Sequence, residues 1–464
     1  MVATEDPAPK PTPPDGAASP AGWTRGQRAL LLLITAVAIA LRLFRIEQWS
    51  WSGAEAATFR AITLPLDGEH GYFADGASQS PLVHLAQRAL LEHVLPGVGE
   101  GWLRLPFAFC GVLAVPALAV LLARMVGPSA ALLGAALFAL HPTHIAASQS
   151  MAPLSCGLTA ALLAGLVPLR SRALTVLPFV VAIGCDPTLL WTVVTALACR
   201  LSEATRSRVA PILLAIAAPV WLWYSPHFGL AMVLGAAAGF VVARHETRLV
   251  LFAAVPTVGL ALGHLLFGWP LGDGLLLALP GMTGLLALVL VQTYRAVHAH
   301  VAGSMRLRAT AATLPAALVF VWITVDAFLH LTAYQGQRAP WRTARDSVLA
   351  SLGARGVVVG AIDGHGPLMC YLRPNHWHQE RPDPHPGCRV IALAEEPGAG
   401  LEAFLRERPE AVHWLVLRAD ELAKLQQDAK AAAALRAFTF VRVVQAPRAH
   451  GDDTLCLLRL DRKQ

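Results

Sequence analysis

The sequence predicts an α-helical, polytopic membrane protein with about eleven transmembrane helices and a soluble C-terminal α/β domain. Three observations predict this fold class. Of the 464 residues, 55% are hydrophobic and only 14% are charged, whereas an ordinary soluble domain is about a quarter charged. Apart from the polar segment 47–101, hydrophobic runs follow one another from residue 25 to residue 335, and arginines lie in short segments between them. Charges become frequent again after Arg338, so a domain boundary is expected between residues 335 and 340.

The N-terminal segment 1–24 is rich in Pro, Ala and Asp and shows no apolar periodicity, which predicts a disordered cytoplasmic tail. The apolar run that follows continues to Ile46, which is about the length of a full span. No small-residue cleavage site follows it, so a retained signal anchor is expected. Arg42 and Arg45 interrupt its outer end and must extend to the membrane surface or face the bundle.

Ten further apolar runs predict the remaining spans, and charge fixes their orientation. Segments that are predicted inside hold arginines, whereas the short segments predicted outside hold neither Lys nor Arg. The N-terminus is therefore expected in the cytoplasm, and the odd number of spans places the C-terminal domain outside. The runs are 103–123, 129–147, 153–169, 173–185, 188–201, 209–225, 228–243, 249–267, 272–293 and 309–333.

The segment 47–101 is a long polar first external loop within the membrane domain 25–335. Its residues 82–94 form an amphipathic stretch that is expected to lie as a helix in the membrane interface. Trp49 and Trp51 suit the same interface, where tryptophan is enriched.

The C-terminal segment 340–464 predicts a small, partly parallel α/β domain, because strand-like and helix-like stretches alternate. Cys370 and Cys388 could form a disulfide in an oxidising compartment. The segment 360–366 is interpreted as a plain turn, because no helix is expected after it. Helices are expected at 341–352, 401–408 and 419–437, and strands at 356–362, 368–372, 389–393, 412–418, 438–444 and 454–460.

Several short motifs resemble those of the GT-C type membrane glycosyltransferases, the superfamily of protein mannosyltransferases and lipid A aminoarabinose transferases. The segment 49–60 resembles their first external loop, which has a Trp, a short spacer and Asp-Glu-Ala. Glu55 matches the Glu of that pattern, and Ala54 stands in place of the Asp. The segment 103–127 resembles the second span of the family, and the segment 140–149 resembles the end of its third span.

The same resemblance includes one departure and one further match. The family's third span continues with a Glu and, two residues later, an Arg, where this chain has Ser150 and Ala152. Residues 80–82 resemble the Pro-Pro-Leu entry to the family's amphipathic helix. The resemblance implies inverting transfer of a sugar from a polyprenyl-phosphate carrier to a lipid, glycan or protein acceptor outside the cytoplasm.

The resemblance and the charge pattern together give the candidate site. Glu55 is the predicted catalytic residue, because a carboxylate must take the proton from the acceptor. Basic residues would stabilise the departing phosphate. No cofactor is implied with certainty; a divalent metal stays open, although no metal ligand is predicted. The predicted substrate-binding residues are Arg60, Asp67, Glu69, Asp75, His84, Arg104, His144 and Gln149.

Two alternative functions stay open. Ala54 favours a catalytically degenerate relative that acts in binding or assembly. A transporter is a weaker alternative, since only Asp326 and the Asp186-Pro187 break suggest a polar path and no repeat is evident. The net charge of +7 is explained by membrane topology, and no nucleic-acid partner is predicted. The expected location is the cell inner membrane of a bacterium.

Overall fold

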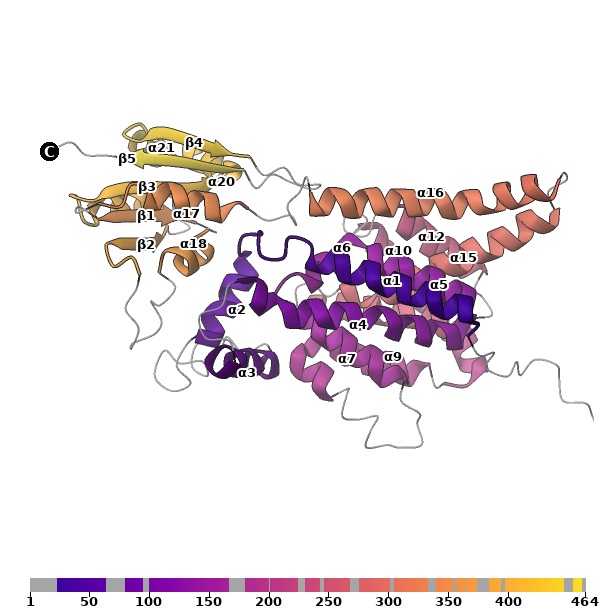
Figure 1. Ribbon diagram of the computed structural model, residues 1–464. Helices are drawn as coiled ribbons and strands as arrows, with labels where there is room; N and C mark the ends of the chain where they lie inside the picture. Colours follow the sequence, from indigo (N-terminus) through magenta and orange to yellow (C-terminus); the bar gives the residue numbers. More distant parts are fainter. Residues whose placement is uncertain are drawn as a thin grey trace, which may run out of the picture.

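The computed structural model has a bundle of helices with a small sheet domain beyond one end of it (Figure 1). Helices α2 and α3 lie at that same end of the bundle. The structure describes residues 23–63, 80–94, 100–166, 180–199, 201–223, 230–242, 246–267, 275–300, 304–332, 339–353, 356–362, 364–373, 384–393, 397–445 and 454–460.

Helices fill the apolar runs that the sequence indicated. Each predicted run contains helix. Of the run 173–185, only residues 180–185 are described, and they are helical. The bundle helices are α1 (Arg25–Leu43), α4 (Glu100–Val126), α5 (Pro128–Leu140), α6 (Pro142–Ser148), α7 (Pro153–Leu166), α9 (Leu190–Ala198), α10 (Glu203–Trp223), α12 (Leu230–Val242), α13 (Thr247–Phe267), α15 (Leu279–His300) and α16 (Met305–Leu331).

Four helices in the described part of the chain are long and apolar enough to cross a membrane: α1, α4, α13 and α16. The α5–α6 pair, bent by 62° at His141, makes a fifth if it counts as one span. These helices confirm a polytopic membrane fold. The count of about eleven spans stays a prediction, because the other helices are shorter or less apolar.

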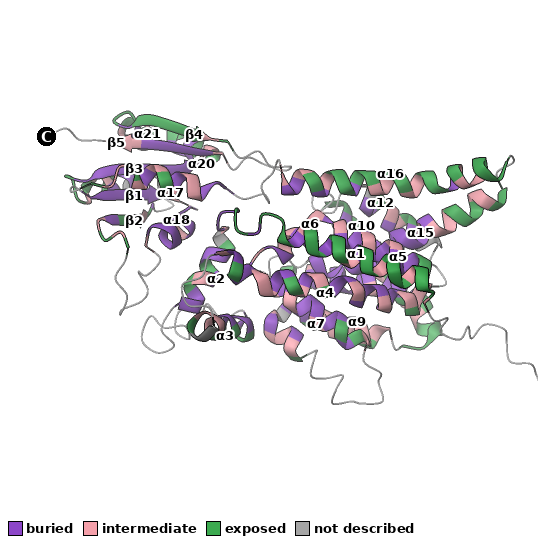
Figure 2. Cartoon of the chain, viewed as in Figure 1, coloured by how far each residue is buried: buried purple, intermediate pink, exposed green. Residues whose placement is uncertain are grey.

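Burial separates the helices that face lipid from those inside the bundle. Only 17% of the residues in the apolar 18-residue stretch of α1 and of α16 are buried, compared with 61% in the corresponding stretches of α4 and α13. Figure 2 shows exposed residues along the length of α16. Most of the exposed residues are apolar, among them Leu318, Trp322 and Phe328, so the exposed surface is suited to hydrocarbon.

The first loop contains two helices that α1 and α4 bracket. They are α2 (Gly53–Thr63) and α3 (Pro81–Ala89), and a π-helical segment, Leu90–Val94, continues α3. The predicted amphipathic helix is confirmed, with exposed Leu82 and Leu85 and buried His84. The prediction that Trp49 and Trp51 face the membrane interface is wrong. Each is only 4% exposed: Trp49 packs with Ile145, Ala327 and Leu331, and the ring of Trp51 lies 5.2 Å from the ring of Phe59 in α2.

A five-stranded sheet with the order β2-β1-β3-β5-β4 organises the C-terminal part. Strands β1, β2 and β3 are parallel, and β5 pairs antiparallel with both β3 and β4. The elements are α17 (Trp341–Leu349), β1 (Val357–Ala361), α18 (His365–Leu372), β2 (Cys388–Ala392), α19 (Pro397–Arg406), β3 (Val412–Arg418), α20 (Ala419–Gln427), α21 (Ala429–Leu435), β4 (Thr439–Val444) and β5 (Leu455–Leu460).

Five of the six predicted strands are confirmed, and the strand at 368–372 is wrong. Those residues belong to helix α18, which also follows the segment 360–366 where no helix was expected. A short apolar run fits a strand and a buried helix equally well, and Pro367 in the first turn of α18 suits a helix start, where its missing N–H is not needed. The predicted helix 419–437 is two helices, because Asp428 caps the second through Ala431 N at 2.8 Å.

The proposed disulfide between Cys370 and Cys388 is absent. Both cysteines are buried free thiols. Burial raises the pKa of Cys370 to about 12, so this thiol stays protonated and unreactive at neutral pH.

Candidate functional site

Helix α2 begins with a reciprocal capping arrangement that places Glu55. Ser52 N donates to Glu55 Oε2 at 3.0 Å, and Glu55 N donates to Ser52 Oγ at 3.2 Å. The spacing Ser-x-x-Glu is the usual signature of such a helix start. The carboxylate of Glu55 is thereby turned toward the bundle, and the side chain is only 1% exposed.

Glu55 forms a buried ion pair with Arg104 of α4. Arg104 Nε lies 2.8 Å from Glu55 Oε1, and Arg104 Nη2 lies 3.2 Å from Glu55 Oε2. Met151 N donates to Glu55 Oε1 at 3.3 Å. Each carboxylate oxygen therefore accepts two hydrogen bonds, so the acceptor capacity of Glu55 is filled.

Arg104 also fastens the chain that links α1 to α2. Its Nη1 donates to Ile46 O at 2.8 Å and to Trp49 O at 3.0 Å, and its Nη2 donates to Ser50 O at 3.3 Å. The guanidinium lies 5.5 Å from the centre of the Trp51 ring, within cation–π distance. Arg104 is fully buried, and its pairing with Glu55 offsets the cost of that burial.

The position before Glu55 has the opposite environment. Ala54 is exposed, as is Arg60 at the end of α2. An Asp at position 54, where the family pattern has one, would therefore be accessible, whereas the neighbouring Glu55 points into the protein. This chain retains the buried member of the pair and lacks the exposed one.

Glu100, at the start of α4, joins this region to the C-terminal domain. Arg342 of α17 pairs with it at 2.9 Å, and Tyr371 of α18 donates its hydroxyl to Glu100 Oε2 at 3.2 Å. Arg104 Nη2 lies 3.6 Å from the same carboxylate. Burial, followed by the negative charge of Glu100, raises the pKa of Tyr371, so its hydroxyl stays protonated and can donate.

A second polar cluster lies inside the bundle at the end of α1. Arg42 is fully buried and donates to Ala38 O and Ala139 O. Its Nη2 lies 2.6 Å from His144 Nδ1, which must accept because a guanidinium only donates. Within the described residues, Arg42 Nε and His144 Nε2 have no hydrogen-bond partner. Of the two positions that the sequence left open for Arg42, the structure shows the one inside the bundle.

The predicted site residues do not all come together. Glu55 and Arg104 form one pair, and His144 belongs to the cluster around Arg42. Gln149 is buried, and its Nε2 caps α1 by donating to Leu41 O, Arg42 O and Phe44 O at 2.9 to 3.2 Å. His84 is buried on α3 and Arg60 is exposed, whereas Asp67, Glu69 and Asp75 lie outside the described residues.

Sequence reasoning missed Glu100, Arg342 and Tyr371. Glu100 is next to the second-span motif, which was a weak signal for its position. Arg342 and Tyr371 had no signal, since the residues they contact are 242 and 271 positions away in the chain.

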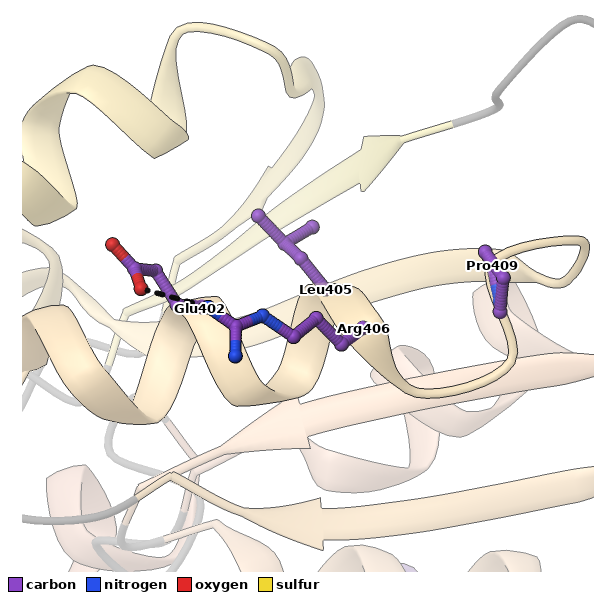
Figure 3. Close-up of a pocket in the computed structure, with 4 residues that line it drawn as sticks. All are labelled: Glu402, Leu405, Arg406 and Pro409. Atoms are coloured by element: carbon purple, nitrogen blue, oxygen red, sulfur yellow. Dashed lines mark hydrogen bonds and ion pairs between the residues drawn. The ribbon is translucent and has the colours of Figure 1, made fainter.

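Metal and pocket geometry add little to this site. No group of three His, Cys, Asp or Glu side chains that could hold a metal occurs among the described residues. Figure 3 shows an open hollow on the C-terminal domain lined by Glu402, Leu405, Arg406 and Pro409. Its four lining residues include none of the predicted site residues, and Glu402 and Arg406 pair with each other there.

Comparisons with known proteins give a fold. No protein-family model and no curated protein matches the chain. ArnT from Cupriavidus metallidurans in the apo state is 15% identical over 95% of this chain and 100% of that chain, with a TM-score of 0.48. The Archaeoglobus fulgidus oligosaccharyltransferase tethered with an acceptor peptide is 11% identical over 91% of this chain and 73% of that chain, with a TM-score of 0.50.

A second structure of the archaeal enzyme, in complex with Zn and sulfate, is 12% identical over 91% of this chain and 72% of that chain, again with a TM-score of 0.50. The likeness confirms the fold that the first-loop and second-span motifs predicted: this chain has the fold of the GT-C type membrane glycosyltransferases.

Proposed function

We propose that this protein is a membrane glycosyltransferase that moves a sugar, with inversion, from a polyprenyl-phosphate carrier to an acceptor outside the cytoplasm. The observation that carries the proposal is the buried Glu55–Arg104 pair at 2.8 Å, which fixes the first loop on the end of a GT-C type bundle. The archaeal oligosaccharyltransferase that shares the fold is described with an acceptor peptide, and its likeness supports a transferase.

The proposed reaction takes place at the end of the bundle where α2, α3 and the C-terminal domain lie. The acceptor hydroxyl or amine attacks the anomeric carbon, and its proton passes to a carboxylate. The bond from that carbon to the carrier phosphate breaks on the opposite face of the sugar. Arg60, which is exposed near the loop, and His84 are the proposed contacts for the departing phosphate.

The proton acceptor in this chemistry is a carboxylate of the first loop. Glu55 is the base that the sequence predicts, but it must first give up hydrogen bonds from Arg104, Ser52 or Met151. Asp67, Glu69 and Asp75 are the other carboxylates that the sequence supplies in the same loop. We therefore treat all four as candidates for the base, with Glu55 also holding the loop in place.

Single amide variants of the four carboxylates test this proposal. Transfer of radiolabel from polyprenyl-phosphate sugars is measured for wild type, Glu55→Gln, Asp67→Asn, Glu69→Gln and Asp75→Asn, with and without a chelator. Loss of the base is expected to lower the rate by about a hundredfold or more, while binding of polyprenyl phosphate persists. Glu92→Gln, which removes an exposed carboxylate paired with Arg88, is the control. Full transfer by all four variants would contradict the proposed chemistry.

The second candidate function is recognition of the carrier without transfer. The exposed Ala54 and the saturated carboxylate of Glu55 favour it, since neither supplies a free base. In that case wild type binds polyprenyl phosphate and transfers no sugar from any donor. Absence of both binding and transfer would favour a transporter instead.

A further inference from the structure

The C-terminal domain contacts the first loop through a defined set of side chains. Helix α18 packs on α2, where Gly366 faces Ala56: a Cβ at Gly366 would lie 3.6 Å from that of Ala56, an ordinary van der Waals contact. Cys370 Sγ donates to Ala56 O at 3.8 Å, and Arg342 N donates to Ser50 Oγ at 3.2 Å. The domain therefore touches both ends of the segment 50–56.

The Tyr371 hydroxyl is the central bond of this contact. It accepts a hydrogen bond from Trp51 N at 2.8 Å and donates to Glu100 Oε2 at 3.2 Å. Trp51 is 4% exposed and Tyr371 is 8% exposed. A buried backbone N–H without a partner is costly, so the loop backbone at Trp51 depends on a side chain from the other domain.

Arg342 acts on Glu55 through two intermediates. Glu100 lies between two guanidinium groups, with Arg342 at 2.9 Å and Arg104 at 3.6 Å. Arg104 in turn is closer to Glu55, at 2.8 Å. Because Arg342 neutralises the charge of Glu100, Arg104 forms its shorter ion pair with Glu55. Without Arg342, Glu100 would compete with Glu55 for Arg104, since low-dielectric surroundings strengthen such attraction.

We infer that Arg342 and Tyr371 are positioning residues, through which the C-terminal domain holds the segment 50–56 and the Glu55–Arg104 pair in place. We call the contacts of these two residues with Ser50, Trp51 and Glu100 the clamp. Neither residue needs to touch substrate for this role. The relevance of the clamp to catalysis rests on the proposed function; the clamp itself does not.

Hydrogen–deuterium exchange of the full-length protein in detergent tests the clamp directly. Tyr371→Phe and Arg342→Gln are expected to raise exchange in peptides covering residues 46–63 by about two- to tenfold, the effect of one lost hydrogen bond. Exchange in α13 and α15 stays unchanged. Arg342→Lys keeps the charge and restores part of the protection, and Arg406→Gln, an exposed arginine of the same domain, changes nothing in the loop.

The double variant Arg342→Gln with Glu100→Gln tests the route through Glu100. It removes the cation and the carboxylate together, so its loop is expected to exchange no faster than that of Arg342→Gln alone. Additive effects, unchanged loop exchange in both single variants, or faster exchange across the whole protein would each overturn the inference.

The same proteins separate this inference from the proposed function. Faster loop exchange in the variants, with a wild type that transfers no sugar, leaves the clamp standing and rejects the transferase. Transfer by wild type, with loop exchange that the variants do not alter, rejects the clamp alone.

Discussion

At the scale of single residues, the Glu55–Arg104 pair holds the first loop on α4 through hydrogen bonds of 2.8 and 3.2 Å. The Trp-x-Trp…Glu-Ala pattern marks Glu55, but its partner Arg104 lies 49 positions away. Pairing over that distance depends on how α1, α2 and α4 pack, which residue spacing does not encode. The burial of Trp49 and Trp51 was missed for the same reason, since Trp suits both a membrane interface and a protein core.

Glu55→Gln is expected to lower the free energy of unfolding by about 3 kcal/mol, because it leaves the buried Arg104 guanidinium without its counter-charge. The matched control Glu92→Gln breaks an exposed pair with Arg88 and should cost less than about 0.5 kcal/mol. Thermal unfolding of both variants in the same detergent measures the difference. Equal, small effects would mean that Glu55 is not held as the structure describes.

Gln149→Met is expected to destabilise the protein by about 1 to 3 kcal/mol, because three buried or part-buried carbonyls at the end of α1, those of Leu41, Arg42 and Phe44, lose their donor. Gln48→Met changes an exposed side chain nearby and serves as the control. Denaturation monitored by the tryptophan fluorescence of the purified variants provides the comparison. A Gln149 variant as stable as the control would exclude a capping role.

At the scale of elements, apolar runs predicted the helices well, because lipid and core both select continuous hydrophobic sequence. The strand pattern of the C-terminal domain was also readable, apart from α18. Helix α2 was not predicted, since Gly53–Thr63 has no marked apolar periodicity of its own; the Ser-x-x-Glu spacing at residues 52–55 was the local sequence signal for its start. Close approach between helices was not predictable, because it depends on which glycine faces which neighbour.

Gly281→Ala should destabilise the bundle by about 1 to 3 kcal/mol, since the added methyl overpacks the helix contact. A Cβ at Gly281 would lie 2.4 to 2.7 Å from the Cα, N and Cβ of Ala253, on the neighbouring helix α13. Gly26→Ala meets no atom within 4 Å and is expected to be neutral or stabilising in helix α1. Thermal unfolding of the two variants measures the difference in stability. A Gly281→Ala variant as stable as wild type would contradict the close α13–α15 packing.

His84 predicts a pH dependence for helix α3. Burial lowers the pKa of His84 below its usual value of 6.5, so the folded protein favours the neutral ring. The stability that this burial allows is present above pH 6.5 and is lost as the pH falls through the lower folded-state pKa. His84→Gln should flatten the decline of melting temperature between pH 7 and pH 5. An unchanged slope would show that His84 is not the group responsible.

At the scale of the whole molecule, the bundle, the first loop and the C-terminal domain meet at one end (Figure 1). Arginines occur in every second segment between the spans, and this pattern predicts that this end is outside the cytoplasm. A phosphatase reporter, active only outside, should be active after Gln464 and inactive after Gly127, in the segment that follows Arg124. A fluorescent protein that folds only in the cytoplasm should give the reverse pattern. Opposite results at both positions would invert the proposed orientation.

The most direct test of the central claim uses wild-type protein alone. Purified protein in detergent is incubated with a panel of radiolabelled polyprenyl-phosphate sugars and a cell-envelope extract that supplies acceptors. The account predicts that label moves from one class of donor to an acceptor while an equal amount of free polyprenyl phosphate is released. No transfer from any donor would contradict it, even if the protein binds polyprenyl phosphate.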